Sequence, residues 1–158
     1  MRYYNKLIKD IKSKNATICI VGLGYVGLPL LINFSKQNFN LIGYDKDKKK
    51  ISILKKAKSY ISNISDNEIE NLRYSKKIKF TSSQNEISNA DVIICCLPTP
   101  ITKNFSPDMN YINNFSILLN KYIKKGQLII LESTTYPGTT EDYILSVCKN
   151  KKFKIGKD

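Results

Sequence analysis

The residues with the clearest chemical meaning are three glycines, Gly22, Gly24 and Gly27, which are spaced as G-x-G-x-x-G. They follow an apolar run at residues 16–21 and open a stretch with helical periodicity, the context in which this spacing binds a dinucleotide. We expect Gly22 to make the tight turn and Gly24 to let a pyrophosphate approach the backbone. Gly27 is expected to let the helix pack closely against the strand.

Backbone N–H groups at the start of that helix, near Tyr25 and Val26, have no intrahelical acceptor and can bind an anion. The glycines and these amides together predict a site for the two phosphates of a dinucleotide. The alternative is a glycine-rich turn in an α/β domain that binds no nucleotide.

A carboxylate at the end of the next apolar run selects the cofactor. Residues 40–44 form that run, and Asp45 follows it, 23 residues after Gly22. An acidic side chain there accepts hydrogen bonds from the adenosine ribose and repels a 2′-phosphate, so it favours NAD over NADP. Lys46 and Lys50 soften this preference without reversing it.

Two hydroxyl-rich loops follow later apolar runs, where open α/β sheets place their ligands. Residues 98–100 read Pro-Thr-Pro, and residues 133–138 read Ser-Thr-Thr-Tyr-Pro-Gly. Their hydroxyl groups could hold a nicotinamide ribose, a sugar or a water molecule. Turn formation and helix capping are the competing explanation for Thr134 and Thr135, because Ser and Thr do both routinely.

Alternating strands and helices must position these residues. We expect strands at 16–21, 40–44, 77–81, 91–97 and 127–132, and helices at 1–14, 27–36, 47–58, 65–74, 108–122 and 138–149. This pattern predicts the α/β class, with a Rossmann-type, doubly wound parallel sheet. We divide the chain into an N-terminal helical extension at 1–15 and an NAD-binding Rossmann domain at 16–158.

The size and composition exclude several classes of protein. A chain of 158 residues, 42% of them hydrophobic, has room for one domain with a real core. Its apolar runs are all shorter than the roughly 18 residues needed to cross a membrane. The first 15 residues lack the apolar region of a signal peptide, so we expect a cytoplasmic protein without membrane contact.

The formal net charge of +13 suggests nucleic acid as a partner, but codon composition explains it as well. The chain has 24 Lys, 23 Ile and 16 Asn, three residues with A/T-only codons. The lysines are also spread along the whole chain. We therefore expect no nucleic-acid partner, and a basic nucleic-acid binder stays as an alternative that a strong inverse salt dependence would reveal.

Cysteine and histidine usage excludes further chemistry. The chain has no His, so His-ligated zinc and His-assisted nucleophiles are absent, and we expect no metal. Cys19, Cys95 and Cys96 lie in apolar strand-like runs, where Cys is usually a small buried hydrophobe. Cys148 has no partner at metal-binding spacing either.

Five motifs in order carry a resemblance over residues 17–141: VGLGYVGLPL, GYDKD, ADVIICCLPTP, PDMNY and LESTTYPGTTE. They resemble the N-terminal NAD-binding domain of the UDP-glucose/GDP-mannose dehydrogenase family. LESTTYPGTTE is most similar to the UDP-N-acetylhexosamine branch, that of the UDP-N-acetyl-D-glucosamine 6-dehydrogenases. The resemblance implies oxidation of the C6 alcohol of a UDP-sugar to a carboxylate with two molecules of NAD, for polysaccharide precursors.

The resemblance also implies roles for individual residues. It implies that the pyrophosphate is cradled by Gly22, Gly24, Tyr25, Val26 and Gly27. Asp45 and Lys50 would hold the adenosine side, and Thr99 the nicotinamide side. Thr135 matches the threonine that contacts the cofactor and orders the catalytic water, and Glu132 is a weaker candidate for the same cleft.

The chain departs from the family in two places. Members of this branch commonly have Gly ahead of Ser-Tyr-Ile and His before the final Ile, where residues 57–58 are Ala-Lys and residue 63 is Asn. The family's catalytic Cys, its active-site Lys and Asn, its nucleotide-sugar domain and its dimerisation helix match no part of this chain. The sheet should therefore lack a sixth strand, which leaves an open edge.

We thus expect weak NAD binding and no catalysis by the 158 residues alone, and a homodimer in the full-length protein. Besides the nucleic-acid binder, a stand-alone NAD-binding module remains as an alternative. Within the resemblance, the alternative is the corresponding portion of a UDP-glucose 6-dehydrogenase.

Overall fold

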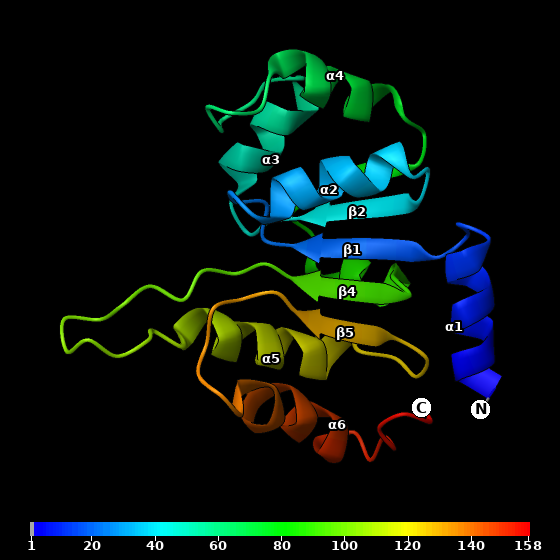
Figure 1. Cartoon of the computed structure of the whole chain (residues 1–158), viewed down its shortest axis with the longest axis vertical. Coiled ribbons are helices and arrows are strands. Elements are labelled where there is room, and N and C mark those ends of the chain that lie inside the picture. Colours follow the sequence, from blue (N-terminus) through cyan, green and yellow to red (C-terminus); the bar gives the residue numbers. More distant parts are fainter. Residues whose placement is uncertain (1) are drawn as a thin grey trace.

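A parallel sheet organises the chain, as a computed structural model describes it over residues 2–158 (Figure 1). Its strands are β1 (Thr17–Val21), β2 (Asn40–Tyr44), β3 (Ile78–Thr81), β4 (Val92–Cys95) and β5 (Leu128–Leu131). They lie in the order β3-β2-β1-β4-β5, and every neighbouring pair is parallel. The predicted α/β class and Rossmann-type sheet are confirmed.

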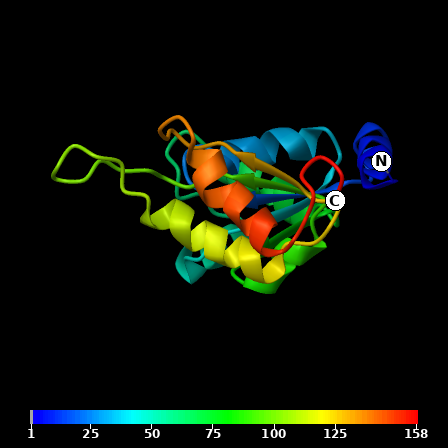
Figure 2. The ribbon, with the colours of Figure 1, turned by 90° about the horizontal axis from the view of Figure 1, so that it is seen from below.

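Helices cover both faces of the sheet (Figure 2). They are α1 (Arg2–Lys12), α2 (Gly27–Lys36), α3 (Lys48–Lys55), α4 (Asp66–Tyr74), α5 (Asn110–Tyr122) and α6 (Ser146–Asn150). Successive strand residues point to opposite faces, so Ile18 and Ile20 join a core with α2, α3 and α4, whereas Cys19 and Val21 join a core with α5 and α6. Both faces of β1 are therefore buried, as its continuously apolar sequence requires.

Most element boundaries lie within a few residues of the prediction. The β2 strand has the predicted bounds, and the helix predicted at 1–14 is observed as α1, with Met1 outside the described residues. The predicted last helix consists of a π-helical turn, η2 (Thr140–Leu145), followed by α6. A 3-10 helix, η1 (Gln84–Asn89), was not predicted, because its sequence has no apolar period.

The start of α5 is later than predicted. Asp108 was expected to cap a helix at 108–122, but α5 begins at Asn110. Asp108 is held outside the helix because its N–H donates to the Pro100 carbonyl, 2.7 Å away. Its carboxylate still accepts a hydrogen bond from the Asn110 N–H at 3.0 Å.

The predicted open edge of the sheet is β5. Residues of β4 are fully buried, whereas Leu128 at the start of β5 is 41% exposed and the rest of β5 is half-buried. At the amino ends of the strands, α1 packs through Leu7 and Ile11 against the core that contains α2, α3 and α4 (Figure 1). No helix within residues 2–158 has the length and apolarity to cross a bilayer.

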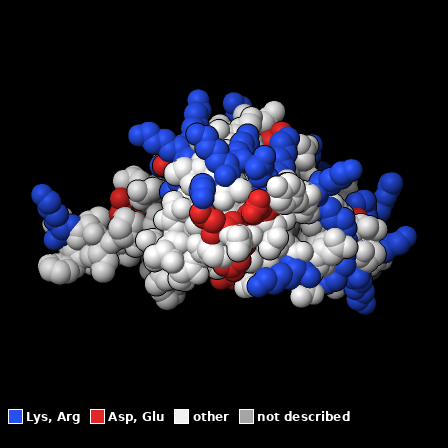
Figure 3. Space-filling view, turned by 90° about the horizontal axis from the view of Figure 1, so that it is seen from above, with Lys and Arg blue, Asp and Glu red and all other residues white. Residues whose placement is uncertain are grey.

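Basic side chains are distributed over several elements. Figure 3 shows many Lys and Arg side chains over the face formed by α3 and α4, with a group of acidic side chains among them. Ion pairs join Lys58 to Asp66 at 2.8 Å and Lys79 to Glu86 at 2.7 Å. The positive charge is thus partly neutralised locally on this surface.

Candidate dinucleotide site

The glycine turn after β1 has the geometry expected from its spacing. Gly22 has a φ of +91°, which L side chains rarely adopt, and a Cβ there would lie 2.8 Å from the Cys96 carbonyl oxygen. A Cβ on Gly27 would lie 1.9 Å from the Gly22 carbonyl oxygen. Only glycine therefore lets α2 begin this close to the turn and to the end of β4.

Gly24 differs, because a Cβ there would meet nothing within 4 Å. The neighbouring Tyr25 and Val26 are exposed, and Val26 caps α2 without a side-chain hydrogen bond. Within residues 2–158, neither the Tyr25 N–H nor the Val26 N–H donates to a protein group. This open backbone at the positive end of a helix fits the pyrophosphate of a dinucleotide.

Asp45 is fixed beside that turn. It is only 7% exposed, and its Oδ2 accepts hydrogen bonds from the Leu23 N–H at 3.0 Å and the Lys50 ammonium at 3.4 Å. Its Oδ1 accepts from the Asp47 N–H at 2.9 Å. A carboxylate offers about four acceptor positions, so one remains for a ribose hydroxyl.

A second cluster lies on the loops after β4 and β5. The Thr99 hydroxyl donates to the Thr134 carbonyl, and the Ser133 hydroxyl donates to the Leu97 carbonyl at 2.8 Å. Thr135 follows, half-buried, in the same loop. These bonds join two loops that are 35 residues apart in sequence.

The two clusters share one end of the sheet. All strands are parallel, and their carboxyl ends lie on the left in Figure 1. The glycine turn approaches Cys96 and Leu97, which lead directly to Thr99. Glu132 also lies at this end; its side chain is exposed, and its N–H donates to the Cys95 carbonyl at 2.9 Å.

Tyr60 contacts the glycine turn in a way that the sequence does not predict. This half-buried residue lies between α3 and α4, and its hydroxyl donates to the Leu23 carbonyl in the glycine turn. Its ring centroid lies 5.6 Å from the Lys50 ammonium. The residue stands in the Ser-Tyr-Ile motif, but a contact spanning 37 residues leaves no local sequence signal.

Cys19, Cys95 and Cys96 are buried, as predicted. Burial raises the pKa of Cys19 and Cys95 to about 12 and that of Cys96 to about 11. The pKa of half-buried Cys148 is raised too. All four therefore remain protonated thiols near neutral pH, without the character of a nucleophile. Among residues 2–158, no three His, Cys, Asp or Glu side chains are grouped to hold a metal.

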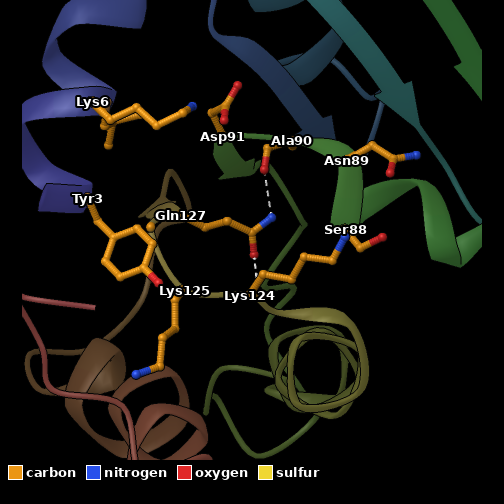
Figure 4. A pocket seen from close by; sticks show the side chains of 11 residues that line it. Tyr3, Lys6, Ser88, Asn89, Ala90, Asp91, Lys124, Lys125 and Gln127 are labelled. Atoms are coloured by element: carbon orange, nitrogen blue, oxygen red, sulfur yellow. Dashed lines mark hydrogen bonds between the residues drawn. The ribbon is translucent and has the colours of Figure 1, made fainter.

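A cavity of about 210 Å³ lies at the opposite, amino end of the strands (Figure 4). Several of its polar groups already have hydrogen-bond or ion-pair partners within the protein. The Gln127 side-chain amide donates to the Ala90 carbonyl at 2.6 Å, and its oxygen accepts from the Lys124 N–H at 2.7 Å. Lys6 pairs with Asp10 at 2.7 Å. The Gln127 bonds join the loops that precede β4 and β5, whereas the Lys6–Asp10 pair lies within α1.

Comparison with known proteins agrees with this geometry. The sequence model of the UDP-glucose/GDP-mannose dehydrogenase family, NAD binding domain, matches residues 16–157. The chain is 34% identical over 145 residues to Protein CapL from Staphylococcus aureus, covering 91% of this chain and 33% of that protein. It is 33% identical over 135 residues to UDP-N-acetyl-D-glucosamine 6-dehydrogenase from Pseudomonas aeruginosa, covering 85% of this chain and 30% of that protein.

The structure is similar to that of UDP-D-ManNAc dehydrogenase from Pyrococcus horikoshii. The TM-score is 0.83 at 28% sequence identity, covering 90% of this chain and 34% of that chain. The chain thus spans about a third of the length of these relatives. The family match confirms the resemblance seen in the motifs: the chain belongs to the UDP-glucose/GDP-mannose dehydrogenase family, and it carries that family's NAD-binding domain.

Proposed function

We propose that this chain is the NAD-binding portion of a nucleotide-sugar 6-dehydrogenase. In the proposed reaction, the C6 alcohol of UDP-N-acetylglucosamine or a related UDP-sugar is oxidised to a carboxylate, and two NAD accept the hydrides. The choice of sugar draws support from the UDP-N-acetyl-D-glucosamine 6-dehydrogenase relative. UDP-N-acetylmannosamine is the next candidate, because the similar solved structure is that of a UDP-D-ManNAc dehydrogenase.

One observation carries the proposal: the open backbone at Gly24 lies next to the fixed carboxylate of Asp45. We assign the pyrophosphate to the amides of Gly24, Tyr25 and Val26. The adenosine ribose is assigned to Asp45, with Lys50 beside it. This pairing supports NAD, because Asp45 would repel a 2′-phosphate.

The second cluster is assigned to the reacting end of the cofactor. Thr99 lies where the nicotinamide ribose would be held, and Thr135 would contact the cofactor and orient the water that completes the second oxidation. Catalysis also requires a nucleophile and a sugar pocket. The thiol pKa values of all four cysteines are raised, so these residues do not supply a thiolate.

Titration calorimetry of the 158-residue chain with NAD and with NADP tests the cofactor assignment. We expect NAD to bind with a dissociation constant on the order of 0.1–1 mM and NADP to bind more weakly. Absorbance at the NADH band should stay flat when NAD and UDP-N-acetylglucosamine are both present. No NAD binding would contradict the site, and NADH formation would contradict the absence of turnover.

The same titration separates a stand-alone NAD-binding module from a portion of an enzyme. A module that works alone must bind NAD at physiological concentrations, so micromolar affinity in a monodisperse sample would favour it. Weak binding without turnover favours the dehydrogenase portion.

A further inference from the structure

Tyr60 contacts the glycine turn at one specific peptide. Its hydroxyl donates to the Leu23 carbonyl, and its ring packs at the margin of the core formed with α2, α3 and α4. Burial raises the pKa of the Tyr60 phenol, so this group remains a protonated donor at any physiological pH. The contact brings the segment between α3 and α4 to the turn between β1 and α2.

This hydrogen bond determines where the Gly24 N–H points. The Leu23 carbonyl and the Gly24 N–H belong to the same planar, trans peptide, so they point in opposite directions. With the carbonyl held by Tyr60, the N–H is directed to the other side of the turn. The preceding peptide is fixed as well, because the Leu23 N–H donates to Asp45 at 3.0 Å.

The ring of Tyr60 has a second contact, with Lys50. The Lys50 ammonium lies 5.6 Å from the ring centroid and 3.4 Å from Asp45 Oδ2. A cation over an aromatic face is attracted to the ring even at partly exposed sites. The ring therefore favours the position in which Lys50 pairs with the carboxylate rather than extending toward solvent.

Held in this way, Lys50 has less freedom to reach a phosphate. A 2′-phosphate on the adenosine ribose would lie beside Asp45 and would need a nearby cation to be accommodated. Lys50 is such a cation, but its ammonium is shared between the carboxylate and the ring. The other flanking lysine, Lys46, lies over the Tyr111 ring at 4.9 Å from its centroid.

We propose that Tyr60 is a positioning residue of the NAD site. Its hydroxyl orients the peptide that presents the Gly24 N–H to the pyrophosphate, and its ring keeps Lys50 on Asp45 so that NAD is favoured over NADP. The proposal rests on the cofactor site assigned above.

Two substitutions separate the hydroxyl from the ring. Tyr60→Phe keeps the ring and removes only the donor, so the NAD dissociation constant should rise about five- to tenfold, the value of one hydrogen bond. The ratio of NAD to NADP affinity should stay the same. Tyr74→Phe is the matched control, since within residues 2–158 its hydroxyl bonds only to Glu70, on the exposed surface of α4. It should leave both affinities unchanged.

Tyr60→Leu removes the ring as well. The NAD affinity should fall at least as far as in Tyr60→Phe, and the preference for NAD over NADP should fall about threefold, the value of the cation contact. Adding Lys50→Met should restore the preference, because the released cation is then gone. A residue with only a structural role would not change this ratio.

The outcomes are distinct. An unsubstituted chain that fails to bind NAD would overturn both the site and the role of Tyr60. Normal NAD binding that Tyr60→Phe leaves within twofold would overturn the positioning role alone. Equal losses of NAD and NADP affinity in a folded Tyr60→Leu would overturn the role of the ring. Should Tyr60→Leu unfold, as far-ultraviolet circular dichroism would show, Tyr60→Met takes its place, because it also lacks the aromatic ring: a ratio of NAD to NADP affinity equal to that of the unsubstituted chain would overturn the role of the ring.

Discussion

The two halves of the carboxyl edge of the sheet are held in different ways. On the side of β1 and β2, Asp45 is buried and accepts backbone hydrogen bonds from Leu23 and Asp47. On the side of β4 and β5, Thr99 bonds to the Thr134 carbonyl in a cluster with much more solvent exposure. The domain itself thus fixes the half that we assign to adenosine and pyrophosphate. The half assigned to the nicotinamide is more exposed to solvent, so contacts within the domain fix its position less firmly.

Loop length explains part of this difference. The turn between β1 and α2 is five residues long, whereas 14 residues separate β4 from α5. That long loop projects from the body of the domain (Figures 1 and 2) and is closed by a bridge between Ile101 and Pro107. Phe105, within this bridged segment, is 91% exposed. Few buried contacts fix such a loop, so local opening should cost little there.

We call the half on the side of β1 and β2 the rigid half. The strongest test of its rigidity compares two glycines. Gly27→Ala places a Cβ 1.9 Å from the Gly22 carbonyl oxygen, so backbone must move, and we expect a loss of at least about 3 kcal/mol in the free energy of unfolding. Gly24→Ala meets no atom within 4 Å and should change stability by less than about 0.5 kcal/mol. Urea denaturation measures both values.

Gly24→Ala should nonetheless weaken NAD binding at least about tenfold, because the Cβ occupies the space assigned to the pyrophosphate. Calorimetry on the folded variant checks this. Unchanged NAD affinity in Gly24→Ala would place the pyrophosphate elsewhere, and a fully stable Gly27→Ala would show that the turn is not rigid.

The same contrast explains what could be predicted from the sequence. The rigid half follows from local signals: the glycine spacing predicts the turn, and an apolar run that ends in an acid predicts β2 and Asp45. Each signal acts over a few residues, so its geometry needs no knowledge of the rest of the chain. The burial of Cys19 and Cys95 followed in the same way from their apolar strands.

Contacts between distant segments could not be predicted in this way. Nothing near Tyr60 indicates that it bonds to Leu23, and nothing near Thr99 indicates that it bonds to Thr134. The late start of α5 has the same origin, because Asp108 is bound to Pro100 across the long loop. These features arise when tertiary contacts override a local preference.

Asp45→Asn and Thr99→Val compare the two halves directly. The amide keeps one acceptor oxygen for three donors and loses the charge, so NAD affinity should fall about 10- to 100-fold. Thr99→Val removes a hydroxyl in the more exposed cluster and should change NAD affinity by no more than about threefold. Calorimetric titrations of both variants measure the contrast. Equal losses would mean that the second cluster is as well ordered as the first.

The smallest expected effect concerns Ala57, which follows α3 on the way to Tyr60. Its φ is +58°, and the two hydrogen bonds of a glycine-type helix end surround it: Ala57 N–H to the Leu54 carbonyl at 3.0 Å and Lys58 N–H to the Ile53 carbonyl at 3.2 Å. The branch commonly has glycine ahead of this Ser-Tyr-Ile motif, and the left-handed backbone gives the reason. An alanine in this conformation costs roughly 1–2 kcal/mol.

Ala57→Gly should therefore raise the free energy of unfolding by about 0.5–1 kcal/mol, after the greater freedom of glycine in the unfolded chain is deducted. Ala90→Gly is the matched control: φ there is −86°, so the same substitution should destabilise the fold. Urea denaturation measures the free energy of unfolding of both variants and so gives the sign of each change. Because the turn is already held by Asp45 and Tyr60, Ala57→Gly should leave the NAD affinity unchanged. A gain in affinity would mean that strain at Ala57 reaches the glycine turn through Tyr60, and that the rigid half is less independent than its hydrogen bonds indicate.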